Sequence, residues 1–197
     1  AGAILGSLAT GFVLIPRLGI QMTLELAVLG GFTGAVGLMF VWRAPLKRRL
    51  AAVAGLVALA GVTVVGQPHW DPLLLSAGMY KYVSELEELS REGVRNYAVS
   101  DYELMYYEEG VTTTVTVARA MGDDNIWLAN NGKIDASTTV DLPTQVLLGH
   151  FGQVFVDDPE RVLVVGLASG ISAGSAAVYS ESSLDVLEIE PAVVTAS

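Results

Sequence analysis

Residues 161–190 contain a pattern that few folds accommodate, in which a Gly-rich turn joins two apolar runs through a short helix-compatible stretch. The run Val162–Val165 predicts a buried strand, Gly166–Gly170 a turn, and Leu184–Ile189 a second strand that ends in acidic residues. This order is typical of the first βαβ unit of nucleotide- or S-adenosyl-binding α/β domains. We therefore expect residues 141–197 to begin a Rossmann-like nucleoside-binding domain. We expect that domain to be incomplete, because only seven residues follow Glu190.

The charge of the chain changes abruptly near residue 66. Residues 1–66 carry five basic residues and one acidic residue, a net charge of +4, whereas residues 67–197 carry six basic and twenty acidic residues, a net charge of −14. A break of this kind marks a domain boundary. The acidic part should repel the phosphates of nucleic acid, so we expect no nucleic-acid partner.

Three apolar runs fill the first 66 residues, namely Ala1–Ile15, Thr23–Trp42 and Leu50–Val65. About twenty apolar residues in a helix span the hydrocarbon core of a bilayer. A signal peptide is a poor match because there are three runs, and buried core helices would show polar faces. We expect residues 1–66 to form about three transmembrane helices at the end of a larger membrane region, with membrane lipid as partner. Both ends of the chain look cut, so we expect it to be a piece of a longer protein.

The basic stretch Arg43–Arg49 predicts a short loop on the cytoplasmic side, because Lys and Arg accumulate there. A third span would then carry residues 67–197 across the membrane. A domain that uses a cytosolic nucleotide requires the opposite side. The sequence leaves the side of this domain open.

The middle of the chain predicts a junction followed by a small β domain. Residues 67–96 contain a turn-rich exit and an amphipathic helix expected over Met79–Gly93. Residues 97–140 predict the antiparallel β unit, because alternating β-formers are followed by the hairpin turn Asn130-Asn131-Gly132. A helix is expected next, over Leu142–Phe155. The fold class expected for the whole chain is therefore a membrane α-helical segment followed by an α/β region.

The turn Gly166–Gly170 and Glu188 form the candidate ligand site. Gly166 and Gly170 let a ligand approach the backbone, and the following helix offers free N–H groups. Glu188 ends the next strand, where an acid accepts hydrogen bonds from ribose hydroxyls. A solvated strand end is the alternative for Glu188. Glu190 is expected to matter less, because it lies on the opposite side of the strand or beyond its end.

The motifs NNGKID, Gly149-His150, DDPERVLVVGLASG and LEIEPAVV follow one another in an order that resembles the spermidine synthase (polyamine aminopropyltransferase) family. The chain is most similar to the bacterial proteins that fuse a multi-span, transporter-like membrane region to such a domain. GAILGSLATGFVLIP resembles a late helix of that region, and WDPLLLSAGMYKY its junction.

The resemblance implies a methyltransferase-like fold that binds decarboxylated S-adenosylmethionine as cosubstrate. Glu188 matches the ribose-binding acid of the family, Gln145 a substrate-contacting residue, and Gly166 and Gly170 the Gly-rich loop. Ser169 stands where the family usually has an Asp, which weakens the attraction for a cationic cosubstrate. Thr144 likewise replaces a Tyr. The catalytic base that accepts the amine proton is expected beyond residue 197, so the catalytic residues are unknown.

Three functions stay open at this level. The first is a membrane-anchored aminopropyltransferase-like enzyme, in which a polyamine nitrogen attacks the carbon next to the sulfonium. The second is an S-adenosylmethionine-dependent methyltransferase, which Ser169 permits. The third is a non-catalytic, transporter-linked sensor of a nucleoside or polyamine.

The chain has no cysteine and two distant histidines, so we expect no metal site. We also expect the protein to be a multi-pass protein of the cell membrane, with a homo-oligomer as a possible assembly.

Overall fold

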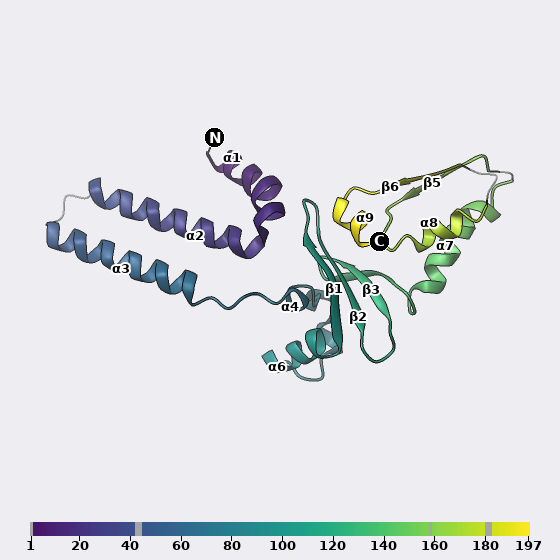
Figure 1. The fold of residues 1–197 in the computed structure, drawn as a ribbon, viewed down its shortest axis with the longest axis horizontal. Helices are drawn as coiled ribbons and strands as arrows, with labels where there is room; N and C mark the ends of the chain where they lie inside the picture. Colours follow the sequence, from purple (N-terminus) through teal and green to yellow (C-terminus); the bar gives the residue numbers. More distant parts are fainter. Residues whose placement is uncertain (1, 42–44, 158, 180–182) are drawn as a thin grey trace. The chain divides into compact units, whose positions relative to one another are not determined.

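The computed structural model describes residues 2–41, 45–157, 159–179 and 183–197. The chain divides into two compact units, Ala1–Trp70 and Asp71–Ser197 (Figure 1). The second unit contains most of the predicted junction as well as both predicted soluble domains, so these segments pack together.

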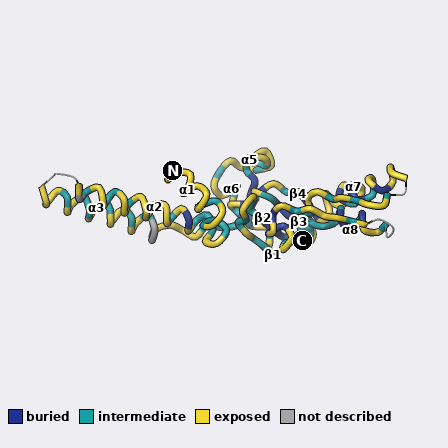
Figure 2. The backbone as a smooth tube through the Cα atoms, turned by 90° about the horizontal axis from the view of Figure 1, so that it is seen from above, coloured by how far each residue is buried: buried dark blue, intermediate teal, exposed yellow. Residues whose placement is uncertain are grey.

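The first unit is helical and is largely exposed (Figure 2). Its elements are α1 (Gly2–Ala9), a π-helix η1 (Thr10–Leu14), α2 (Ile15–Val41) and α3 (Leu46–Val65). The path from α1 to α2 is helical except at Gly19, whose φ of 82° and ψ of 164° break it. Figure 1 shows α2 and α3 side by side in opposite directions.

A single described segment, Gly2–Met39, is long and apolar enough to cross a membrane. Its apolar window contains no buried residue, although signal sequences near an N-terminus pass the same test of length and composition. The first two predicted runs belong to this one segment, because Pro16 and Arg17 continue the helix instead of ending it. The described residues do not support three separate spans.

The predicted basic loop over Arg43–Arg49 is corrected in its second half. Arg43 lies outside the described residues. Pro45 precedes α3, and Lys47, Arg48 and Arg49 lie in the first turn of that helix. Pro45 suits a helix start for two reasons. Its fixed φ is compatible with the helix, and it lacks a backbone N–H, which would have no partner within the helix at this position.

The prediction of one amphipathic helix over Met79–Gly93 is wrong. The structure has short helices instead, α4 (Pro72–Leu75), α5 (Met79–Tyr82), η2 (Val83–Glu85), α6 (Arg91–Arg95) and the π-helix η3 (Asn96–Ser100). Ser90 has extended backbone angles, and its hydroxyl accepts a hydrogen bond from the Gly93 N–H at 3.0 Å. Ser90 therefore starts a new helix where the predicted one would have continued.

The predicted antiparallel β unit is confirmed as a four-stranded sheet in the order β1-β2-β3-β4. The strands are β1 (Tyr102–Glu109), β2 (Thr114–Ala120), β3 (Ile126–Asn130) and β4 (Lys133–Ser137). Asn131 and Gly132 form the β3–β4 turn with φ values of 49° and 78°. Positive φ at both positions gives the turn that matches strand twist, which is why Asn-Gly occurs there.

Both faces of this sheet are covered. On one face, Val115, Val117 and Leu128 pack against Ala192 and Val193 of the C-terminal helix α9 (Pro191–Ala196). On the other face, Ala118, Trp127 and Ala129 pack against Leu73 of α4. The central strands are therefore buried on both sides, and burial of this apolar surface stabilises the unit.

A two-stranded parallel sheet follows the antiparallel one. Helix α7 (Leu142–Val154) packs on α8 (Ile171–Ala176), which contacts both β5 (Arg161–Val165) and β6 (Ser183–Leu187). The pairing runs from Arg161–Ser183 to Val165–Leu187 in parallel register, as a βαβ unit requires. Several apolar side chains of this sheet stay exposed, including Val165 at 77% and Leu187 at 58%.

Candidate functional site

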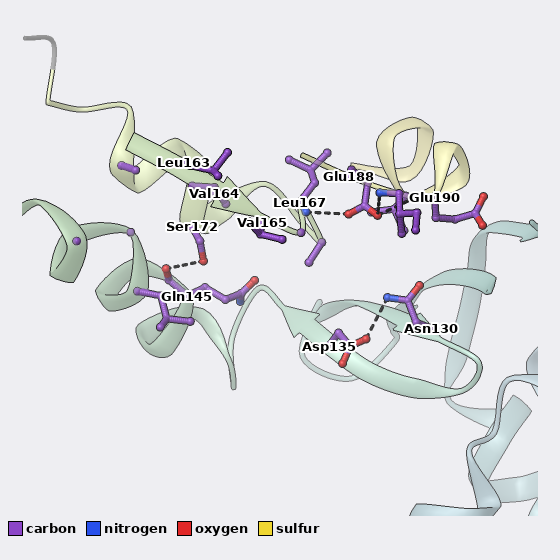
Figure 3. A pocket seen from close by; sticks show the side chains of 18 of the residues that line it. Asn130, Asp135, Gln145, Leu163, Val164, Val165, Leu167, Ser172, Glu188 and Glu190 are labelled. Atoms are coloured by element: carbon purple, nitrogen blue, oxygen red, sulfur yellow. Dashed lines mark hydrogen bonds between the residues drawn. The ribbon is translucent and has the colours of Figure 1, made fainter. Parts of the chain in front are cut away.

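A cavity of about 700 Å³ lies where the parallel strands approach the antiparallel sheet (Figure 3). Its apolar wall comes from β5 and α7, with Val162, Val164 and Leu148 among the lining residues. Its polar wall comes from the antiparallel sheet and its turns, from α7 and from the end of β6, and it carries Thr112, Asn130, Asp135, Gln145, Glu188 and Glu190. Cavities of this size with one apolar and one polar wall suit small organic ligands.

The Gly-rich loop occupies one side of the cavity and has an unusual backbone. Gly166, Ala168 and Gly170 have φ values of 89°, 47° and 77°. Glycine adopts these angles without the penalty that a Cβ atom causes, whereas Ala168 is strained. A Cβ atom at Gly166 would meet nothing within 4 Å, so open space lies beside the backbone at this position.

Glu188 follows β6 and binds the Gly-rich loop directly. One oxygen, Oε2, accepts a hydrogen bond from the Leu167 N–H at 2.8 Å, and Oε1 accepts bonds from the N–H groups of Ile189 and Glu190 at 2.8 and 3.0 Å. Burial raises the pKa of Glu188, but the backbone donors outweigh it and hold the pKa below its usual value. Glu188 is therefore a carboxylate held by the loop and not only a solvated strand end.

Gln145 and Ser169 are brought together by the fold. Gln145 is 7% exposed, its Nε2 donates to the Ser137 carbonyl at 2.8 Å, and its Oε1 accepts from the Ser169 hydroxyl at 2.6 Å. Ser172 also donates to the Gln145 carbonyl at 2.8 Å (Figure 3). The Gln145 amide is thus fixed between β4 and the Gly-rich loop. Neither this amide nor the Ser169 hydroxyl carries a charge.

Asp135 reaches the cavity because β4 is irregular. The register with β3 shifts between Leu128 and Ala129, so that no β3 residue lies opposite Asp135 in the sheet. A bulge of this kind redirects side chains. The Asp135 carboxylate accepts a hydrogen bond from Asn130 Nδ2 at 3.0 Å and pairs with Lys133.

Glu190 has a structural role that the sequence did not reveal. It is 3% exposed and accepts hydrogen bonds from the Thr112 N–H at 2.8 Å, the Thr112 hydroxyl at 2.7 Å and the Ala192 N–H at 3.3 Å. Burial raises the pKa of Glu190, but these donors hold it below its usual value. Glu190 caps α9 and ties it to the β1–β2 turn. A sequence signal existed, since an acid directly before Pro-Ala often precedes a helix.

The lining residues give the cavity a negative character. Asp135, Glu188 and Glu190 are acidic, and no Lys, Arg or His is among the described residues that line it. In the described ranges, no group of three or more His, Asp or Glu side chains is arranged to hold a metal ion. The arrangement suits a ligand with hydroxyl donors and positive charge.

The predicted site residues therefore share one region. Gly166, Gln145 and Glu188 line the cavity, Ser169 bonds Gln145, and Gly170 ends the loop before α8. Glu190, Asp135 and Asn130 are among the polar lining residues that the sequence did not indicate. Comparison with models of known protein families and with curated proteins finds no match for this chain.

Proposed function

We propose that the unit Asp71–Ser197 binds the adenosyl part of a sulfonium cosubstrate, as the start of a Rossmann-like, methyltransferase-like domain. In the whole protein it would serve a membrane-anchored, spermidine synthase-like enzyme that transfers an aminopropyl group from decarboxylated S-adenosylmethionine to a polyamine. The apolar residues 1–66 would hold the protein in the cell membrane as part of a multi-pass region.

The observation that carries this proposal is the bond between Glu188 and the Gly-rich loop. The Leu167 N–H lies 2.8 Å from Glu188 Oε2, so the loop and the acid face the same space. Three backbone N–H groups donate to the carboxylate, and the Ala168 N–H is a fourth, weaker backbone donor that also lowers its pKa. A ribose hydroxyl that donates to Oε2 would take the place of the Ala168 contact.

The charge of the cavity supports a cationic cosubstrate. A sulfonium or ammonium group gains mainly from the carboxylates of Glu188 and Glu190, because the charge of Asp135 is already paired with Lys133. The apolar wall around Val162 and Val164 would receive the adenine ring. The polyamine nitrogen would attack the carbon next to sulfur, the C–S bond would break, and methylthioadenosine would leave. The base for the amine proton is expected beyond residue 197.

The test is titration calorimetry of the full-length protein in detergent with methylthioadenosine. Glu188→Gln should weaken binding about tenfold or more, because a charge-assisted hydrogen bond contributes about 1.5–3 kcal/mol and each 1.4 kcal/mol is a factor of ten. Asp185→Asn is the matched control, since Asp185 lies in β6, shortly before Glu188, and pairs only with the exposed Arg161 among the interactions described.

A second ligand separates ribose contact from damage to the loop. A methylthioadenosine analogue that lacks the contacting ribose hydroxyl should bind wild type and Glu188→Gln with nearly equal affinity, because the interaction is then already lost. If Glu188→Gln weakens the binding of both ligands by the same factor, Glu188 acts only by holding the loop. If methylthioadenosine does not bind the full-length wild-type protein, the adenosyl proposal fails.

Methyl transfer from S-adenosylmethionine is the second candidate, and Ser169 favours it. Its hydroxyl donates to Gln145 at 2.6 Å, so this end of the site is neutral and does not select a cationic aminopropyl group. Mass spectrometry of products from the full-length protein with both cosubstrates distinguishes the two reactions. An aminopropylated polyamine supports the first candidate, and a methylated acceptor supports the second.

A further inference from the structure

A second cavity, of about 30 Å³, lies between the junction helices and the antiparallel sheet. Aromatic side chains dominate its walls, since Tyr82 of α5, Tyr97 of η3, Tyr102 of β1 and Trp127 of β3 all line it. None of these four residues lines the larger cavity, so the two are separate.

The buried indole of Trp127 is the informative group. Trp127 is 7% exposed, and its Nε1 has no hydrogen-bond partner among the residues that the structure describes. Its ring meets Tyr102 edge-on with centroids 5.5 Å apart, which orders the ring but does not satisfy the N–H. An unpaired buried donor costs about 1–3 kcal/mol, and buried tryptophans usually find an acceptor.

Neighbouring polar groups already have other roles. The Tyr82 oxygen accepts a hydrogen bond from the Ile134 N–H at 3.2 Å, and the Tyr97 hydroxyl donates to Glu85 at 3.1 Å. Ser76 shares a 2.5 Å hydrogen bond with Thr116. Each of these oxygens retains a lone pair, so each can accept one more bond.

Size and charge decide what fits. A cavity must offer about 10–15 Å³ to hold a water molecule, and a site near 30 Å³ holds one water but no sugar, amino acid or amine chain. A cation is disfavoured because the unpaired group is itself a donor. The required ligand is small, neutral and able both to accept and to donate.

We propose that this cavity binds one ordered water molecule, which accepts a hydrogen bond from Trp127 Nε1 and donates to the hydroxyl oxygens of the cavity wall. Ser76, Tyr82, Tyr97 and Tyr102 line the cavity, and the hydroxyl oxygen of each can accept a hydrogen bond. The water then joins α4 and β1 to β3, so that it fastens the junction segment to the sheet. This inference is independent of the proposed enzymatic function.

The experiment is NMR of the full chain in detergent with ¹⁵N-labelled tryptophan. The chain has three tryptophans, and Trp127→Phe identifies the signal of interest. We expect a nuclear Overhauser cross-peak between the Trp127 indole proton and water. The sign of this cross-peak should be the one given by a water molecule that stays bound for a long time. A well-resolved Trp127 signal without this cross-peak overturns the proposal.

Tyr102→Phe provides the control for hydroxyl protons, which can imitate bound water. The cross-peak should persist in this variant, because the indole N–H and Ser76 still hold the water. Its loss, with the other indole signals unchanged, would assign it to the phenol proton and would also overturn the proposal.

Discussion

Glu188 and Glu190 are two positions apart but differ in what their carboxylates hold. Glu188 holds the Gly-rich loop through Leu167, whereas Glu190 holds the β1–β2 turn through Thr112. Glu190 also leaves no room at Gly110, where an added Cβ atom would come within 2.4 Å of its Oε1. The first is therefore a candidate ligand group, and the second is a structural anchor.

Glu190→Gln should lower the free energy of unfolding by about 1–3 kcal/mol at neutral pH, because the amide presents a donor to groups that need an acceptor. The folded pKa of Glu190 is lowered, so its contribution is fully present above the unfolded pKa of about 4.3 and is lost as pH falls through the folded value. The difference between wild type and variant should shrink below about pH 4. Denaturant unfolding across pH measures it.

The exposed Glu87 gives the control for that measurement. Glu87→Gln makes the same change of charge and should alter stability by less than about 0.5 kcal/mol. A Glu190→Gln variant as stable as Glu87→Gln would contradict the anchoring role.

Ala168→Gly should raise stability, by up to about 1 kcal/mol, because glycine tolerates the positive φ of 47°. Part of the gain is offset by lost packing of the methyl group against the core around Val115. Ala173→Gly in helix α8 is the control and should lose about 0.5–1 kcal/mol. Thermal unfolding compares the two, and a destabilised Ala168→Gly would show that the methyl contact outweighs the strain.

At the scale of elements, sequence patterns predicted what local chemistry determines. The β3–β4 turn was predictable because Asn131 and Gly132 tolerate positive φ, and β5 was predictable because its Val-rich run precedes Gly166. The helix over Met79–Gly93 was not, since the Ser90 cap competes with helix continuation. The bulge at Asp135 and the burial of Glu190 depend on contacts between distant segments, which no local pattern encodes.

The junction meets the sheet through two glycines. A Cβ atom at Gly78 would come within 2.1 Å of the Gly132 carbonyl oxygen, and Gly78 has a φ of 59°. Gly78→Ala should therefore cost more than about 1 kcal/mol of stability, because both the backbone strain and the clash oppose it. Gly122→Ala is the control, since nothing lies within 4 Å of its added Cβ atom. Equal unfolding midpoints for the two variants would contradict this docking.

At the scale of the whole molecule, the apolar unit and the acidic unit are joined by a short segment that is held to α2. Gln21 accepts a hydrogen bond from the Trp70 N–H at 3.0 Å, and its Nε2 donates to the Pro68 carbonyl at 3.3 Å and to Glu25 at 3.1 Å. One amide therefore satisfies two backbone groups of the connection. Backbone groups without such partners are costly where water is scarce, as near a membrane.

The proposed function requires the acidic unit to lie in the cytoplasm, where adenosyl cosubstrates are made. Lys47, Arg48 and Arg49 in the first turn of α3 would favour the opposite side if α3 crossed the membrane. The chain has no cysteine, so Glu87→Cys introduces a single thiol at an exposed position. We expect the chain in the membrane pellet after alkaline extraction, and we expect Cys at position 87 to react with an impermeant maleimide only after the cells are permeabilised. Permeabilised cells also control for thiol access. Rapid labelling of intact cells would place the unit outside and would exclude a cytosolic cosubstrate.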